Sequence, residues 1–177
     1  MVIGIYRGGS VLRNDGLKLF QRRSFDPITL GHVDIIHRAA KMFDRVVVCV
    51  VANANKKTLL TLEERKEHAA RVTANLPNVT VDTWDGLLVD YAGRYENPVV
   101  VRGLRAVSDF EYEFMMALTN KKLDPRVETV FVASDERYTY LSSSGVKEIA
   151  FFGGDFAQFV PTEILDDLRR KIDGRSK

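Results

Sequence analysis

The sequence predicts an α/β protein built on a single doubly wound, parallel five-stranded sheet. Apolar segments rich in β-branched residues alternate with segments of helical periodicity. The runs VVVCVV, VVV and VFVA are apolar throughout, which is typical of strands covered on both faces by helices. The chain of 177 residues has no internal repeat, low-complexity stretch or linker. We therefore expect one domain spanning residues 1–177.

Each predicted strand is a short apolar run bounded by polar or turn residues. The five strands are Val2–Tyr6, Arg45–Ala52, Val79–Thr83, Pro98–Arg102 and Thr129–Ala133. Right-handed crossovers between parallel strands would bring their carboxyl ends to one edge of the sheet, where ligands of such folds bind.

Helices are predicted between the strands from apolar residues at helical spacing. The first covers Gly31–Phe43, and a capping box at Thr61–Glu64 begins a second that Pro77 closes. The remaining helices are Asp109–Leu123, Ser142–Ala150 and Thr162–Ile172.

Residues 7–23 are more than a strand–loop–helix unit needs, and we interpret Arg7–Arg23 as an insertion. This segment holds five basic residues against Asp15, a net charge of +4, so the rest of the chain carries −2. The overall charge of +2 therefore gives no argument for nucleic-acid binding. Turn residues at Asn14–Gly16 between two partly apolar arms predict a small hairpin, and a flexible loop is the alternative.

The composition is that of a soluble globular protein, with 45% hydrophobic and 28% charged residues. No apolar run approaches the ~20 residues that span a bilayer, and the N-terminus does not resemble a signal peptide. The single cysteine, Cys49, lies in an apolar run, which favours an inert buried thiol. A cytoplasmic location fits these features.

The segment Ser24–His32 (SFDPITLGH) has the features of an anion-binding helix start. Thr29 can cap the helix, Gly31 permits close approach to the backbone, and His32 lies in the first turn beside unpaired N–H groups. A ring N–H there could hold a phosphate oxygen whose charge grows during nucleotidyl transfer. A simple capping residue or a core histidine is the alternative. His37 and His68 lack this context and are expected at the surface.

Further candidates follow the other strands. Lys56 and Lys57 could neutralise phosphates, and Arg102 and Arg105, which flank Gly-Leu, could bind phosphate oxygens bidentately. Glu113 could accept a hydrogen bond from a sugar hydroxyl. Solvated surface is the alternative for the lysines, and it is the interpretation we prefer for Glu111.

The residues that follow the third and fifth predicted strands are also candidates, and the signal after the fifth strand is the stronger. Leu87 and Leu88 could line a pocket, although core packing explains them equally well. Ser142, Ser143 and Ser144 begin a helix and could bind a second phosphate, whereas a plain N-cap would need only one serine. Together these residues describe a polyphosphate site with no candidate nucleophile and no cluster of metal ligands.

Four motifs in this order and spacing resemble the bacterial phosphopantetheine adenylyltransferases, within the T/H-x-G-H nucleotidyltransferase superfamily. They are SFDPITLGHVDII, the KK loop followed by TLEER, RGLRAVSDFEYE, and YLSSSGVKE. The resemblance covers Ser24 to about Ile172 and the first strand. It implies a Rossmann-like nucleotidyltransferase fold, transfer of AMP from ATP to 4′-phosphopantetheine with Mg²⁺, and a homohexamer.

The resemblance also implies which residues act. His32 would stabilise the transition state, and Ser24 would contact both substrates. Phosphopantetheine would further contact Lys56, Leu88 and Arg102. ATP would contact Phe25, His32, Gly103, Leu104, Arg105, Glu113, Tyr138, Thr139, Tyr140, Leu141, Ser142, Ser143 and Ser144.

Two features depart from the family pattern. Arg7–Arg23 stands where the family has only Pro-Gly, and Thr58 replaces the proline usual after the two lysines. The insertion leaves two alternatives open beside the active enzyme. One is a non-catalytic phosphopantetheine- or coenzyme A-binding protein with a disrupted ATP site, and the other is a nucleotidyltransferase acting on another phosphate acceptor.

Overall fold

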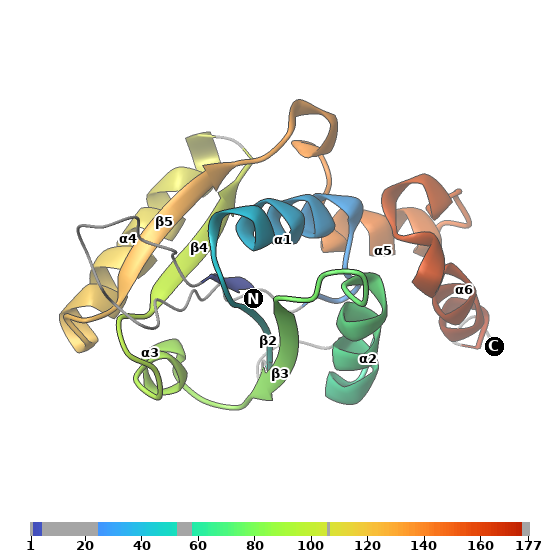
Figure 1. Cartoon of the computed structure of the whole chain (residues 1–177). Helices are drawn as coiled ribbons and strands as arrows, with labels where there is room; N and C mark the ends of the chain where they lie inside the picture. The colour runs from blue at the N-terminus through green and yellow to red at the C-terminus, as the bar shows by residue number, and fades with distance from the viewer. Residues whose placement is uncertain (1, 5–24, 53–57, 106, 175–177) are drawn as a thin grey trace.

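The computed structural model describes residues 2–4, 25–52, 58–105 and 107–174. The insertion Arg7–Arg23, Ser24, Lys56 and Lys57 lie outside these ranges. The predicted α/β fold with parallel strands is confirmed (Figure 1). Strand β2 (Val46–Val51) pairs in parallel with β3 (Val79–Trp84), and β4 (Val99–Leu104) pairs in parallel with β5 (Glu128–Ala133).

The first strand differs from the prediction. Strand β1 (Val2–Gly4) is shorter than expected and pairs with β4 in the antiparallel direction, with Val2 opposite Val101. It also lies against β2, so it stands between the two parallel pairs, which form separate sheets in the described residues. The crossover rule assumed a short connection, but residues 5–29 separate β1 from the next helix. A connection of that length can return the chain from either end of the sheet, so it does not fix strand direction.

The helices occupy nearly the predicted ranges (Figure 1). They are α1 (Leu30–Met42), α2 (Leu62–Val72), α4 (Val107–Leu123), α5 (Ser143–Phe151) and α6 (Leu165–Asp173), the last preceded by a 3₁₀ turn at Thr162–Ile164. Sequence patterning missed the five-residue helix α3 (Leu88–Ala92) and the 3₁₀ turns at Glu136–Tyr138 and Ala157–Phe159. Segments this short are below the length at which periodicity is readable.

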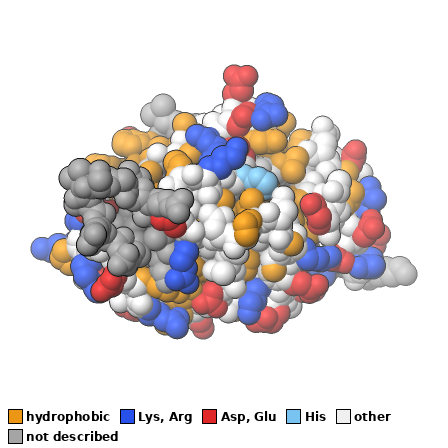
Figure 2. Space-filling view, in the orientation of Figure 1, with side chains coloured by type: hydrophobic (Ala, Val, Ile, Leu, Met, Phe, Trp, Pro, Cys, Tyr) orange, Lys and Arg blue, Asp and Glu red, His pale blue; other side chains and the backbone are white. Residues whose placement is uncertain are grey.

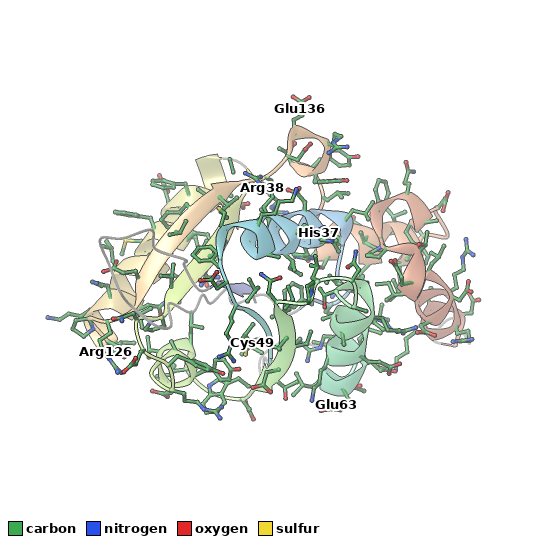
Figure 3. The ribbon with its side chains drawn as sticks, viewed as in Figure 1. His37, Arg38, Cys49, Glu63, Arg126 and Glu136 are labelled. Atoms are coloured by element: carbon green, nitrogen blue, oxygen red, sulfur yellow. The ribbon has the colours of Figure 1, made fainter. Side chains whose placement is uncertain are left out.

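The core is aliphatic and centres on the parallel strands. Every residue of β2 is buried, including Cys49 in the middle of the molecule (Figure 3), and burial raises the pKa of its thiol to about 12. An unreactive buried thiol follows. Helix α1 packs on β1, β2 and β4, whereas α4 packs on β4 and β5. No described helix has the length and hydropathy to cross a bilayer.

Strand β5 corrects one expectation. Its run VFVA was expected to be covered on both faces, yet Val130 and Ala133 are exposed and only Val132 is buried. The strand lies at the end of the order β1-β4-β5 among the described residues, so no further strand shields it. The exposed surface of the neighbouring α4 is also apolar, with Tyr112 and Met115 more than half exposed.

A charged network joins the C-terminal helix to α2. Lys171 contacts both carboxylate oxygens of Glu64, at 2.6 and 2.9 Å, while Asp167 pairs with Arg71 and lies 3.4 Å from Nε2 of His68. Acidic and basic side chains accordingly alternate over α2 and α6 in Figure 2. His68 is buried, at 3% exposure, which contradicts the expected surface position. The 3₁₀ turn at Thr162–Ile164 packs on α2, and Asp167 of α6 reaches His68. A pattern read from α2 alone could not reveal these contacts.

Candidate active site

The start of α1 presents His32 in a defined orientation. The backbone N–H of Thr29 donates to Nδ1 of His32 at 3.0 Å, and the Thr29 hydroxyl lies 3.1 Å from the same atom. An atom that accepts a backbone N–H cannot itself carry a proton, so the ring proton is on Nε2. Thr29 is the N-cap residue of α1, as predicted, and its backbone N–H selects the imidazole tautomer. Nε2–H is the donor that this ring can offer to an anion.

The aromatic ring of Phe25 supports that orientation from behind. Phe25 packs edge-on against His32, with ring centroids 5.1 Å apart and an interplanar angle of 80°. The residue as a whole is 1% exposed, and its backbone has a left-handed φ of 45°. A non-glycine residue in this region costs roughly 1–3 kcal/mol, and such strain gathers at ligand sites.

His32 lines a narrow cleft at the carboxyl ends of β4 and β5, whose cavity volume of about 10 Å³ is roughly the room that one water molecule needs. Three segments form it: the start of α1, the end of β4, and the chain that follows β5. The lining residues are Thr29, Gly31, His32, Ile35, Gly103, Arg105, Ser134, Tyr138 and Leu141. The structure therefore brings together five residues predicted for the nucleotide site from three separate stretches of sequence.

Gly31 lets another segment of the same chain approach the start of α1 closely. A Cβ at this position would lie 3.3 Å from Cβ of Tyr138, tighter than ordinary contact. Glycine thus lets the first turn of α1 lie directly against the segment after β5. The sequence interpretation expected this freedom to serve a ligand.

Arg105 connects three segments at the mouth of the cleft. Its Nε and Nη2 contact the two carboxylate oxygens of Asp109 at 2.9 and 3.2 Å, and its Nη1 donates to the backbone oxygen of Leu141 at 2.8 Å. The bidentate geometry predicted for a phosphate is thus made with a carboxylate in this structure. Asp109 is a site residue that sequence reasoning missed, although its spacing of four residues from Arg105 was a readable signal.

Arg102 and Glu113, which were predicted to contact different substrates, form one buried ion pair. Nε of Arg102 lies 3.1 Å from Oε2 of Glu113, and the side chains are 3% and 11% exposed. Despite this ion pair, Oε2 of Glu113 has no hydrogen-bond partner among the described residues. A buried carboxylate oxygen in that condition favours an additional donor such as a hydroxyl.

The three serines have three different environments. The hydroxyl of Ser142 caps α5 by accepting from the N–H of Gly145 at 2.9 Å, and the hydroxyl of Ser143 donates to the backbone oxygen of Pro27 at 2.8 Å. Ser144 is exposed. Ser142 therefore satisfies the simple capping interpretation, while Ser143 joins α5 to the loop before α1.

Several predicted contact residues do not line this cleft. Leu88 is buried at the start of α3, Thr139 is exposed with its hydroxyl bonded to the backbone oxygen of Glu136, and Tyr140 is 71% exposed. Leu104 contributes its backbone oxygen to the N–H of Ser134.

Asp26 is a second site residue that sequence reasoning missed. It is 1% exposed, and its carboxylate accepts hydrogen bonds from the backbone N–H groups of Leu59 and Leu60 and from Nζ of Lys147. Asp26 lies inside the motif SFDPITLGH, so its position could have been noticed. The sequence interpretation concentrated on His32 and assigned Asp26 no role. Among the described residues, no group of three or more His, Cys, Asp or Glu side chains could hold a metal ion.

A parallel α/β fold whose strand ends meet a histidine-bearing helix start is typical of nucleotide-binding proteins, among them the nucleotidyltransferases. Comparison with known proteins agrees. The cytidylyltransferase-like family model matches residues 24–149. A solved structure from Vibrio parahaemolyticus, described provisionally as a nicotinate-nucleotide adenylyltransferase, superposes with a TM-score of 0.58 at 18% identity, covering 82% of this chain and 94% of that one. This likeness concerns the fold alone.

Two relatives are much more similar in sequence, and both are named phosphopantetheine adenylyltransferase. The protein from Caldanaerobacter subterraneus subsp. tengcongensis is 53% identical, over 84% of this chain and 93% of its own length. The protein from Clostridium botulinum strain 657 is 49% identical, over 87% of this chain and 94% of its own length. The chain belongs to the phosphopantetheine adenylyltransferase family.

Proposed function

We propose that this protein transfers the adenylyl group of ATP to 4′-phosphopantetheine, giving dephospho-coenzyme A and pyrophosphate. Family membership names the reaction. The observation in the structure that supports it best is the fixed tautomer of His32, which offers Nε2–H in a cleft at the strand ends. The protein is an enzyme of coenzyme A biosynthesis.

The chemistry needs positioning and charge stabilisation more than proton transfer. An oxygen of the acceptor phosphate forms a bond to the α-phosphorus of ATP, and the bond from that phosphorus to the bridging oxygen of the β-phosphate breaks. The electron pair leaves with pyrophosphate. The acceptor phosphate is already an anion, so no base has to activate it. Nε2–H of His32 would donate to an α-phosphate oxygen as its charge grows.

The assignment of the other residues remains part of the proposal. Ser24, Lys56, Leu88 and Arg102 would hold phosphopantetheine, with Ser24 also reaching ATP. The remaining ATP contacts would be those of the family motifs: Phe25, Gly103, Leu104, Arg105, Glu113, Tyr138, Thr139, Tyr140, Leu141, Ser142, Ser143 and Ser144. The shared ion pair of Arg102 and Glu113 would place the two substrates beside each other.

Mg²⁺ fits this site as an ion held mainly by the phosphates of ATP. The cleft is lined by a guanidinium, hydroxyls and an imidazole, and the nearby carboxylate of Asp109 is paired with Arg105. Mg²⁺ commonly binds through substrate phosphates and retained waters with few protein ligands. When bound, it would supply charge neutralisation at the phosphates.

We further propose that the chain forms a homo-oligomer, a hexamer as the family resemblance implies. Support comes from the apolar patch on α4 and β5, formed by Phe110, Tyr112, Phe114, Met115, Leu118 and Val130, all more than a third exposed. A patch of this kind commonly marks a protein interface. The unit would be one domain spanning residues 1–177, with its insertion at residues 7–23. It would act in the cytoplasm, a reducing compartment that supplies ATP.

A panel of acceptors tests the assignment. Purified full-length protein is incubated with ATP, Mg²⁺ and, in turn, 4′-phosphopantetheine, nicotinate mononucleotide or phosphocholine, and the products are identified by mass spectrometry. Dephospho-coenzyme A from phosphopantetheine alone is the expected result. Adenylylation of a different acceptor in its place would support the alternative of a nucleotidyltransferase with another substrate.

A further inference from the structure

The buried carboxylate of Asp26 joins three segments that are far apart in the sequence. Its Oδ1 accepts the N–H of Leu60 at 2.9 Å, and its Oδ2 accepts the N–H of Leu59 at 3.0 Å. The same Oδ2 accepts a hydrogen bond from Nζ of Lys147 on α5 at 2.7 Å. The two oxygens of the carboxylate thus bind backbone N–H groups of the loop between β2 and α2. The same carboxylate forms an ion pair with α5.

The two segments that Asp26 holds lie next to residues proposed to bind different substrates. Leu59 and Leu60 directly follow, in sequence, the segment with the lysines proposed for the acceptor phosphate. Lys147 lies one turn into α5, whose first residues are the serines proposed for ATP. Ser143 makes a second link from α5 to the loop before α1 that carries Asp26, by donating to the backbone oxygen of Pro27.

The charges around Asp26 make this junction hard to replace. Arg65 of α2 is 3% exposed, interacts electrostatically with Asp26, and donates to the backbone oxygens of Val51 and Thr61. It thereby fixes both ends of the connection between β2 and α2. One buried carboxylate facing two cations and two N–H groups has every oxygen in use, so a neutral side chain could satisfy only part of the set.

We infer that Asp26 is a positioning residue, which sets the acceptor loop and the nucleotide helix relative to each other through Leu59, Leu60 and Lys147. This inference rests on the proposed function. Asp26 itself contacts neither substrate, and it acts through the segments it holds. Since a misplacement of about 1 Å can cost on the order of 10²-fold in rate, the junction matters for both substrates.

The test compares Asp26→Asn with Lys147→Met in the full-length protein. Asp26→Asn keeps the shape of the side chain, but its amide can accept through only one atom, and it should raise the KM for both ATP and phosphopantetheine by roughly 10-fold. Lys147→Met leaves the two backbone bonds of Asp26 in place, so it should raise the KM for ATP alone. Lys147→Arg should restore most of that loss. Lys41→Met, at an exposed lysine in the last turn of α1, is the matched control.

The KM values separate positioning from folding, because a smaller fraction of folded enzyme lowers the apparent kcat and leaves KM unchanged. A change in KM for only one substrate in Asp26→Asn, or for neither, would overturn the inference. If Asp26→Asn does not fold, the selective effect of Lys147→Met and its rescue by arginine decide the question. If the wild type shows no turnover, the proposed function has failed. Calorimetric titration of the same variants with ATP and with phosphopantetheine then tests the inference separately.

Discussion

His32 shows how a single hydrogen bond can decide what a side chain does. Sequence reasoning identified the residue from its place in T-x-G-H and from the anion-binding character of a helix start. It could not show that the Thr29 N–H fixes the tautomer, because that depends on a ring rotamer and a 3.0 Å contact. Asp26 was missed for a related reason. Its role lies in contacts to other segments, and no periodicity or spacing within its own motif reports such contacts. The contact of Asp109, by contrast, could have been read from its spacing to Arg105.

Replacing His32 tests its proposed role in the transition state. We expect His32→Ala to lower kcat by about 10²–10³-fold while the KM values change little, because the interaction strengthens only as charge grows on the α-phosphate. Steady-state kinetics with both substrates varied would measure this split. His37→Ala, on the same helix, is the control (Figure 3). If kcat/KM fell only because KM rose, with kcat unchanged, His32 would be a binding contact only.

His68 should make the stability of the fold depend on pH. Burial and the neighbouring Arg71 guanidinium lower its pKa, against the weaker opposing effects of Asp167 and Glu67. The unfolded chain takes up a proton near the ordinary value of 6.5, whereas the folded protein does so only at lower pH. The free energy of unfolding should therefore fall as the pH is lowered through 6.5, down to the folded-state pKa.

Urea unfolding at pH 7.5 and pH 5.5 would measure this difference. His68→Gln, which keeps a donor toward Asp167 but does not titrate, should show a smaller loss of stability between the two pH values than the wild type. His37→Gln controls for the removal of a histidine as such. An unchanged difference in His68→Gln would show that other groups cause the pH dependence.

At the scale of secondary structure, long elements were predictable and their partners were not. The four longest strands and five of the helices lie within a few residues of their predicted ranges, because apolar periodicity and capping residues are local signals. The direction of β1 and the cover over His68 depend on how distant segments meet. Helix α3 and the 3₁₀ turns are too short to have a readable period. The helix start that carries T-x-G-H was therefore placed correctly, while the segments packed around it were predicted only in part.

The insertion Arg7–Arg23 is the element whose effect on activity is most open to direct test. The described residues that line the cleft of His32, Gly103 and Arg105 all follow the insertion in sequence. Long surface insertions cost little in loop-closure free energy, so the fold should tolerate the segment. We expect a variant with Arg7–Arg23 replaced by Pro-Gly to bind both substrates and to turn over within about 10-fold of the wild type, since a larger change would require the reacting groups themselves to move.

Activity assays on both proteins, with circular dichroism to confirm folding, would make this comparison. A wild type that is inactive beside an active shortened variant would show that the insertion blocks the site.

For the whole molecule, the exposed apolar surface on α4 and β5 was the feature least visible in sequence. The run VFVA was expected to be covered on both faces, yet Val130 is exposed in the described structure. Phe110, Phe114 and Leu118 of α4 are exposed as well. A pattern of apolar residues cannot distinguish burial within a chain from burial between chains. The same ambiguity explains why the resemblance alone, and no residue pattern, suggested an oligomer.

A charge placed in that surface should dissociate the oligomer. Met115 is 61% exposed on α4, and we expect Met115→Glu to lower the mass in solution toward that of one chain, 20.0 kDa, because a buried unpaired carboxylate opposes association. Light scattering coupled to gel filtration would measure the mass. Met42→Glu, at an exposed methionine of α1, is the matched control. A monomeric wild type would remove the basis for the proposed assembly.

The central claim is that one cleft, with His32 at its centre, joins ATP to a phosphate acceptor. Pyrophosphate release by the purified full-length protein, measured with both ATP and 4′-phosphopantetheine and with each one omitted, tests it most directly. The account predicts release only when both are present, in one-to-one ratio with dephospho-coenzyme A. No release, from protein that still binds coenzyme A in calorimetry, would contradict the account and identify a binding protein in place of an enzyme.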